Sequence, residues 1–294
     1  MRIVTYNIQY GLGADGRFDL ARIAGEIAAA DVVGLQEVER HWARSGGVDQ
    51  VAELARLLPD HYWVFGANLD MDASTPGPDA RPQHRRRQFG NMILSRWPIV
   101  STRNVPLPKF GTWRDHSIHR GLLEAVIAPP GAAPLRIYTT HLCHLASGTR
   151  LPQLRFILDF IARAPAEGGA WSGGHPNPAA GWLEGGLPPM PREAVLMGDL
   201  NFLPGSPEYE LVAGAVDKHG RRIWPLDGLV DAQVAAGMAE TDNPTHPEGG
   251  RIDHVFVSAS LAGAVRGLRV DSAATGSDHW PVWLDVEVEG RDAT

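Results

Sequence analysis

The sequence predicts an α/β protein in which short strands alternate with amphipathic helices. Residues 3–6 and 32–35 are apolar runs typical of buried strands, and residues 19–30 between them have a helical pattern. The 33 glycines and 23 prolines among 294 residues predict many turns between short elements. Hydrophobic residues make up 44% of the chain, enough for a sizeable core, and no repeat of the kind that a solenoid requires is present.

Periodicity and capping signals predict three helices. The helix at 19–30 begins at Asp19, a residue type that favours helix N-termini. Residues 51–58 place apolar side chains at positions i, i+3, i+4 and i+7, and Pro59 ends that helix. A third amphipathic helix is expected at 151–161. The further expected strands are 92–94, 122–128, 135–140, 195–197, 252–257 and 282–288.

Two segments interrupt this pattern. The segment at about 164–192 is rich in glycine and proline, so it cannot be a helix or a central strand. Strand-like runs of similar character lie on both sides of it, which favours a loop insertion over a domain boundary. Residues 70–88 are also loop-like and end in three arginines, residues 85–87, which we interpret as a solvated face. We therefore expect one domain, residues 1–290, with this insertion.

Composition excludes several classes of protein. The chain has 27 basic and 34 acidic residues, a net charge of −7, which lacks the basic footprint of a protein that coats nucleic acid. No run of eighteen apolar residues is present, so we expect no transmembrane segment. The single cysteine, Cys143, excludes an intramolecular disulfide and a cysteine-built zinc site. With no signal-peptide pattern before the first strand, we expect a cytoplasmic protein.

Polar side chains stand at the ends of several predicted strands. They are Asn7, Glu37, His141, Asp199 and Asn201, which follow strands, and Asp253, Asp278 and His279, which stand where strands begin. Strand ends are where ligand groups converge in an α/β sheet, so we expect these residues to lie together. Carboxylate and amide oxygens suit Mg²⁺ or Mn²⁺, and histidines supply acid and base groups near neutral pH. This combination favours hydrolysis at phosphorus.

A glycine pattern at 11–16 offers a competing interpretation. It fits GxGxxG, follows a strand, and has Glu37 about twenty residues further on, as in dinucleotide-binding proteins. The helix of such a protein begins within the glycines, whereas here Asp19 caps a helix that begins later. This late start disfavours an NAD-dependent oxidoreductase.

The order of the motifs resembles the endonuclease/exonuclease/phosphatase superfamily, which has the DNase I-like fold. The motifs are TYNI (5–8), GLQEV (34–38), GNMILSR (90–96), RGLL (120–123), THL (140–142), GDLN (198–201), RIDH (251–254) and SDHWP (277–281). The resemblance implies a four-layer α/β sandwich of two packed mixed sheets flanked by helices. It also implies one or two Mg²⁺ or Mn²⁺ ions.

The resemblance assigns a role to each candidate residue. It implies that Asn7, Glu37 and Asp278 hold the metal, with Glu37 as the principal ligand. Asp199 and Asn201 would orient the attacking water and the phosphate, with the option of a second metal. Asp253 would pair with His279, which acts as a base or phosphate ligand, and His141 would contact the scissile phosphate. Arg120 and Asn91 would bind phosphate, and Asn91 is also a candidate partner for His141, because the expected earlier-strand carboxylate is absent.

The THL motif at 140–142 reduces the number of candidate substrate classes. Exonuclease III-like repair enzymes carry a Tyr/Asn-type motif there, whereas the His version resembles the DNase I, sphingomyelinase, inositol-phosphatase and deadenylase branches. Residues 90–96, the pair Arg150 and Gln153, and residues 206–209 resemble bacterial sphingomyelinase-like and GPI-processing-like proteins. We therefore expect a phosphodiesterase acting on a small molecule or lipid headgroup. The alternatives are a nuclease acting on DNA or RNA and, more distantly, a catalytically inactive binding module.

Overall fold

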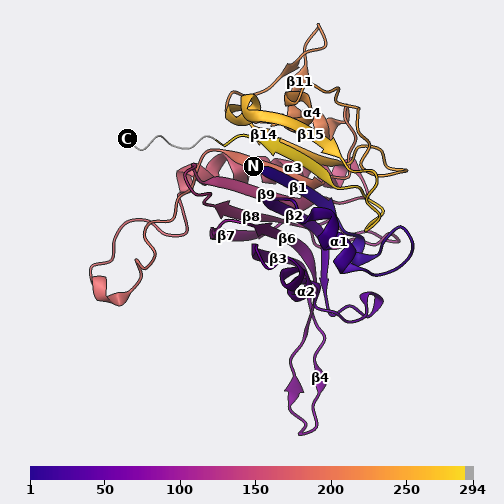
Figure 1. The fold of residues 1–294 in the computed structure, drawn as a ribbon, viewed down its shortest axis with the longest axis vertical. Helices are drawn as coiled ribbons and strands as arrows, with labels where there is room; N and C mark the ends of the chain where they lie inside the picture. Colours follow the sequence, from indigo (N-terminus) through magenta and orange to yellow (C-terminus); the bar gives the residue numbers. More distant parts are fainter. Residues whose placement is uncertain (289–294) are drawn as a thin grey trace.

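The computed structural model describes residues 1–288, which contain two six-stranded mixed sheets (Figure 1). The first sheet has the order β15 (Val265–Val270), β16 (Val282–Val286), β1 (Arg2–Asn7), β2 (Val32–Arg40), β6 (Arg86–Ser95) and β3 (Tyr62–Asp72). The second has the order β13 (Leu229–Asp231), β14 (Asp253–Ser258), β10 (Ala194–Asp199), β9 (Leu135–His141), β8 (Gly121–Ile127) and β7 (Ile99–Pro106). One pair in each sheet is parallel, β1 with β2 and β9 with β10.

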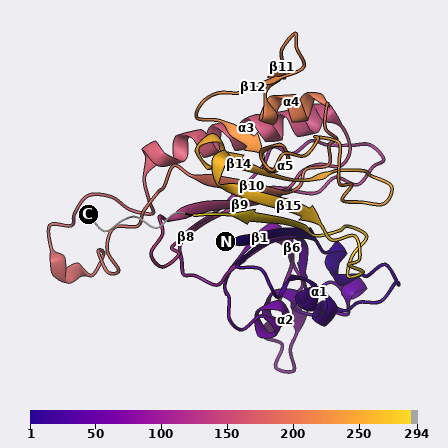
Figure 2. The same ribbon diagram turned by 45° about the horizontal axis from the view of Figure 1, so that its top comes forward.

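Helices cover the outer face of each sheet and complete four layers (Figure 2). Apolar side chains of α1 (Leu20–Ile27) and α2 (Gln50–Leu57) pack on the first sheet. Those of α3 (Ser147–Glu167) and α4 (Pro207–Ala213) pack on the second. The expected four-layer α/β sandwich is confirmed.

Shorter elements connect the main strands and helices or extend from them. They are β4 (Thr75–Pro76) paired with β5 (Pro82–Gln83), β11 (Ala215–Val216) paired with β12 (Arg222–Ile223), α5 (Ala232–Ala235), and the 3₁₀ turns η1 (Gln9–Gly11), η2 (Ala43–Ser45), η3 (Pro178–Ala180) and η4 (Ala259–Ala264). The β4–β5 hairpin and the segment that carries η3 extend away from the layers (Figure 1). Among the helices of residues 1–288, none combines the length and apolar character needed to cross a bilayer.

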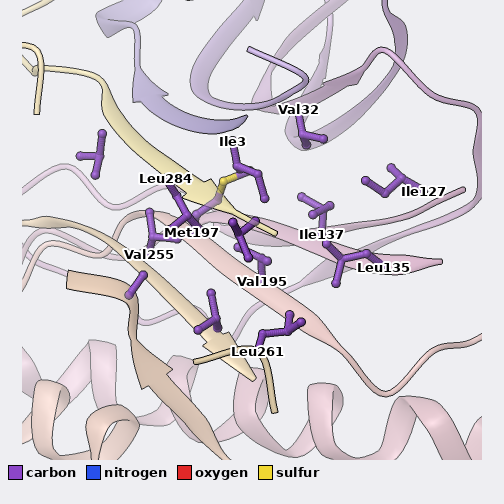
Figure 3. Close-up of a cluster of buried hydrophobic side chains, with 14 of the residues drawn as sticks. Ile3, Val32, Ile127, Leu135, Ile137, Val195, Met197, Val255, Leu261 and Leu284 are labelled. Carbon is purple, nitrogen blue, oxygen red and sulfur yellow. The ribbon is translucent and has the colours of Figure 1, made fainter. Parts of the chain in front are cut away.

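The central core lies between the two sheets (Figure 3). Ile3 and Leu284 of the first sheet meet Ile137 and Met197 of the second, and these four side chains are fully buried. Gly34 allows this close approach, because a Cβ there would lie 2.5 Å from the Met197 Cε. The packing therefore holds the ends of β1 and β2 next to those of β9 and β10.

The strand that carries Glu37 differs from the sequence-based expectation. We expected a strand at 32–35 with Glu37 in the following loop, but β2 continues to Arg40. The register against β6 shifts between Leu35 and Val38, which is a β-bulge, and Glu37 has a φ of 63°. Positive φ is costly for a residue with a side chain, so the surrounding sheet imposes this conformation. The bulge redirects Glu37 without ending the strand.

The prediction of a loop at 70–88 is wrong. Within this segment β3 and β6 pair up to Asp72 and Arg86, and the β4–β5 hairpin lies beyond them. The segment is exposed on both faces, so it lacks the apolar alternation by which half-buried strands are identified. The charged, proline-containing sequence of a projecting hairpin therefore looks like a loop.

The insertion begins later than expected. Helix α3 runs to Glu167 and contains Pro165, a residue that removes the hydrogen bond to the carbonyl of Ile161. The buried guanidinium of Arg136 donates to that carbonyl instead, at 2.7 Å. The helix therefore continues past residue 164.

The C-terminal end of the domain also differs from the expectation. The last strand ends at Val286 rather than 288. The single domain, residues 1–290, stays a prediction, and residues 289 and 290 lie outside the described part of the chain.

We expect Gly198→Ala to lower the free energy of unfolding by about 2 kcal/mol or more. Gly198 has a φ of 145°, and an added Cβ would lie 1.9 Å from the Thr140 carbonyl oxygen, so β9 and β10 would have to separate. Urea denaturation would measure the change. Gly25→Ala is the matched control, because Gly25 lies exposed in α1 and a methyl group added there would have no atom within 4 Å. Equal stability of the two variants would contradict this account of Gly198.

Candidate active site

Strand pairing brings the predicted residues together at one edge of the sandwich. In the second sheet Asp199 lies directly between His141 of β9 and Asp253 of β14 in the ladder. In the first sheet Asn7 ends β1, and His279 precedes β16, the antiparallel neighbour of β1. All five of these residues are at most 7% exposed.

The amide of Asn7 joins the two sheets. Its Nδ2 donates to Asp199 Oδ2 at 2.9 Å and to Glu37 Oε1 at 3.3 Å, and lies 3.4 Å from His279 Nε2. Its Oδ1 accepts from the backbone N–H of Gln9 at 3.0 Å. In this orientation Asn7 presents a donor to the carboxylates, so a role as metal ligand would require the amide to turn over and lose the bond from Gln9.

Asp253 and His279 form the expected pair. His279 Nδ1 lies 2.8 Å from Asp253 Oδ2, and its Nε2 lies 3.8 Å from Asp199 Oδ2. Burial alone would lower the pKa of His279, but the carboxylates of Asp253 and Asp199 outweigh it and raise the pKa to about 10. His279 is therefore an imidazolium near neutral pH, which favours the role of phosphate ligand or acid over that of base.

His141 lies between two carboxylates in a buried position. Its Nε2 is 3.2 Å from Asp199 Oδ2, and its Nδ1 is 3.7 Å from Glu37 Oε1. Burial, together with the charges of Arg120 and His279, holds the pKa of His141 well below its usual range. His141 is therefore a neutral imidazole, able to donate one hydrogen bond to a phosphate oxygen.

Nearby donors and cations only partly balance the negative charges of Glu37 and Asp199. Burial raises the pKa of Glu37, an effect that Arg120 and Asn7 only partly oppose. Burial also raises the pKa of Asp199, and the Asp253 and Glu37 carboxylates add to this increase while His279 opposes it. The one hydrogen bond that Glu37 accepts from the described residues is the long one from Asn7. Such a half-buried carboxylate, with 19% of its side chain exposed, has oxygen lone pairs free for a cation.

Asn201 and Asp278 flank this centre. Asn201 has a φ of 55°, donates its backbone N–H to Asp199 Oδ1 at 3.1 Å, and donates its side-chain amide to the Leu142 carbonyl. Asp278 Oδ2 accepts from Gln9 Nε2 at 2.7 Å. Asp278 is near enough to raise the pKa of Glu37. Of the residues predicted to hold a metal, Glu37 and Asp278 therefore bring carboxylates to this part of the site, whereas Asn7 presents its amide N–H groups.

Two groups of residues within 1–288 offer ligand atoms within 4.8 Å of one another. One is Asp199, Asp253 and His279, and the other is His246, Asp278 and His279. Glu37 belongs to neither group, but its carboxylate, like those of the two groups, is a hard oxygen ligand of the kind that Mg²⁺ and Mn²⁺ prefer. The chemistry of the donors therefore fits the expected metal.

His246 was not predicted from the sequence. Its ring lies edge-on to His279, with centroids 4.9 Å apart, and its Nε2 is 3.9 Å from Asp278 Oδ2. The backbone N–H groups of Glu248 and Gly249 donate to its Nδ1, so the proton of the neutral ring is on Nε2. His246 thus faces the site as a donor rather than as a metal ligand. It lies in a turn outside any strand, so no sequence pattern identified it.

The two predicted phosphate ligands have different surroundings. Arg120 is 5% exposed and lies beside Glu37, and burial lowers its pKa against the effects of Glu37 and Asp199. Asn91 is buried, and its amide donates to the carbonyls of Gly121 and Thr139. Within the described chain Asn91 makes no hydrogen bond to His141, because its donors hold the neighbouring strands instead. A direct phosphate contact from Asn91 stays a prediction.

We expect Asp253→Asn to lower the pKa of His279 from about 10 toward its ordinary value, because the variant loses the nearer carboxylate charge. Titration of ¹⁵N-labelled histidines by NMR in metal-free protein would measure it. The raised pKa contributes stability that is fully present below about pH 6.5 and is lost as the pH rises through about 10. The variant should therefore be less stable than the wild type at pH 6, and its free energy of unfolding should fall less between pH 6 and pH 10. An unchanged His279 titration would contradict the pairing.

Comparison with known proteins agrees with this arrangement. Among solved structures, an endonuclease/exonuclease/phosphatase from Beutenbergia cavernae has a TM-score of 0.64 and 24% identity, over 100% of this chain and 73% of that chain. The mannosyl-6-phosphatase of Bacteroides thetaiotaomicron has a TM-score of 0.62 and 17% identity, over 98% and 99%. ANGEL2, a 2′,3′-cyclic phosphatase, has a TM-score of 0.55 and 17% identity, over 96% and 93%.

Comparison with curated proteins found no significant match. At the identities found among solved structures, likeness shows the fold alone. The sequence profile of the Endonuclease/Exonuclease/phosphatase family, however, matches residues 4–279, which include every candidate site residue. The chain therefore belongs to the endonuclease/exonuclease/phosphatase family.

Proposed function

We propose that this protein is a metal-dependent phosphoesterase that hydrolyses a phosphodiester by in-line attack of water. The observation that carries the proposal is the buried cluster in which Asn7, Glu37, His141, Asp199 and His279 converge from both sheets. A family of phosphoester-cleaving enzymes supplies the reaction class, and the cluster supplies the groups that the reaction needs.

Each residue has a distinct part in this proposal. Asp199, held by Asn7 and by the Asn201 N–H, orients the attacking water, and its raised pKa suits a group that accepts a proton near neutral pH. His279, kept protonated by Asp253, stabilises the charge that develops on the phosphoryl oxygens. His141 donates a hydrogen bond to the same phosphate.

Glu37, with Asp278 beside it, would hold the divalent ion. When bound, the ion supplies charge neutralisation at the phosphate and at the leaving oxygen. The bulge in β2 fixes the direction of the Glu37 carboxylate, and Gln9 fixes that of Asp278 through the 2.7 Å hydrogen bond. These contacts hold the two carboxylates that would bind the ion.

The proposed substrate is a small molecule or a lipid headgroup, as in the sphingomyelinase-like and GPI-processing-like bacterial branch. Similarity to a mannosyl-6-phosphatase and a 2′,3′-cyclic phosphatase supports a small phosphoester. Two of the three arginines at 85–87, which could otherwise contact a nucleic-acid backbone, have partners within the protein, since Arg86 pairs with Asp70 and Arg87 stacks over Trp42. A cytoplasmic location stays part of this proposal.

We expect Asp199→Ala and His279→Ala each to reduce turnover by at least about a hundredfold, the scale of lost acid–base or electrostatic catalysis. The Mg²⁺-loaded enzyme would be incubated in parallel with phospholipid vesicles, supercoiled plasmid and a chromogenic diester, with EDTA as a control. Circular dichroism would establish that both variants fold. Near-normal activity of either folded variant would refute the assigned site.

The same assay separates the candidate functions. Headgroup release without plasmid nicking would support the lipid branch. EDTA-sensitive nicking that Asp199→Ala abolishes would make the protein a nuclease and redirect attention to the projecting β4–β5 hairpin. Turnover of none of the three substrates would favour an inactive binding module.

We expect Glu37→Gln to move the dependence of rate on Mg²⁺ to concentrations at least about tenfold higher, because an amide oxygen is a weaker ligand than a carboxylate. Titration of rate against Mg²⁺ and against Mn²⁺ would measure the change. Glu53→Gln is a control, because Glu53 lies in α2 and its carboxylate contacts Arg56 instead of the site. An unchanged metal dependence in Glu37→Gln would remove Glu37 from the metal position.

A further inference from the structure

A pocket of about 220 Å³ opens beside Glu37. Its apolar walls are formed by Leu69, Phe89 and Ile118, which lie on β3, on β6 and before β8. Its polar lining consists of Glu37, Arg120, Arg44, His116 and His144, with Trp42 beside them. Glu37 is the only acidic side chain among the lining residues, and it is the proposed metal ligand. The rest of the polar lining is therefore made of nitrogen groups.

Arg120 is buried and forms the floor of this pocket. Its guanidinium has no carboxylate within 4.0 Å in the described chain, and its Nη1 is buried without a hydrogen-bond partner. Its Nη2 lies 3.3 Å from His144 Nδ1. A buried cation without an ion-pair partner is costly unless an anion binds to it. The unpaired Nη1 therefore marks a position for a ligand oxygen.

Further donors without partners line the same pocket. Because Arg120 donates to His144 Nδ1, the proton of the neutral His144 ring is on Nε2, and no described residue accepts from it. Arg44 uses Nε and Nη2 to hold Glu39, and its guanidinium stacks over Tyr10 and Trp42, so its position is fixed while its Nη1 makes no hydrogen bond to residues 1–288. The His116 side chain makes no hydrogen bond within the described residues and is exposed to solvent.

This pattern points to an anion rather than to a neutral ligand or a cation. Donors from Arg120, Arg44, His116 and His144 have no matching acceptors in the lining except Glu37. Hydrogen bonds from charged donors to phosphate or carboxylate oxygens are stronger than those between neutral groups. The apolar walls suit the carbon skeleton that joins such an anion to the reacting phosphate.

We propose that this pocket binds a second anionic group of the substrate, so that the substrate is a phosphoester whose alcohol portion carries a further phosphate or carboxylate. This inference rests on the proposed function, since the position of the scissile phosphate is taken from it. The scissile phosphate lies at Asp199, His141 and His279. The second group lies against His144, His116 and Arg44, with Arg120 between the two positions.

Three related ligands test the pocket without turnover. Glycerol 3-phosphate and 3-phosphoglycerate differ by one distal carboxylate, and 2,3-bisphosphoglycerate adds a second phosphate. Their dissociation constants would be measured by calorimetry on the full chain, made metal-free with a chelating resin so that no free polycarboxylate competes. We expect each of the two ligands with a second anion to bind at least about tenfold more tightly than glycerol 3-phosphate, the effect of a few charge-assisted hydrogen bonds. The net charge of −7 and the nearby carboxylates would otherwise favour the less charged ligand.

The double substitution His116→Gln with His144→Gln should reduce this preference to less than about threefold. His219→Gln, in the exposed β11–β12 hairpin, should retain it. Because the preference is a ratio within one protein, a general loss of affinity does not imitate the result, and circular dichroism verifies the fold. Equal binding of all three ligands by the wild type, or an undiminished preference in the double variant, would overturn the proposal.

The outcome is separable from that of the proposed function. If the Mg²⁺-loaded enzyme hydrolyses simple diesters but the protein shows no preference for ligands with a second anion, the proposed role of the pocket is refuted. The proposed phosphoesterase activity is then still supported. A preference that depends on His116 and His144 in a protein that hydrolyses no phosphoester would refute the phosphoesterase and leave an anion-binding pocket.

Discussion

The face-to-face packing of the two sheets is the constraint on which the candidate site depends. Neither sheet holds the complete set of groups, since Asn7 and Glu37 come from the first and His141 and Asp199 from the second. The hydrogen bond from Asn7 to Asp199 crosses between them. Gly34 leaves room for the Met197 side chain where the two sheets pack against each other. Core packing thus determines the geometry of the polar cluster.

Burial gives the cluster its electrostatic character. The same environment raises the pKa of Glu37 and Asp199 and lowers that of His141, because it disfavours every isolated charge. His279 differs because Asp253 lies against it and keeps it charged. A site of this kind pairs a charged histidine with a neutral one and leaves carboxylates in need of a cation, an arrangement suited to distributing charge around a phosphate.

Alternation of apolar runs and the polar residues after them was sufficient to predict the α/β class and most of the cluster. Asn7, His141 and Asp199 end apolar runs, so their position was visible in the sequence. His246 was not, because it reaches the site from an irregular turn. The role proposed for His116 and His144 was also hidden, since it depends on which donors remain unpaired after folding. The β4–β5 hairpin lacked the one-sided burial that identifies a strand.

The bulge in β2 allows one strand both to pair with β6 and to carry Glu37. Before it, residues up to Leu35 pair with β6 in one register, and after it Val38 to Arg40 pair in another, so both halves contribute to the sheet. Glu37 lies between these registers and is exempt from the alternation that assigns every other residue of the strand to one face. The chain can therefore vary the group at this position without recoding the hydrophobic pattern on either side. The choice of side chain at residue 37 is thus limited by its positive φ of 63° rather than by the alternation of the sheet.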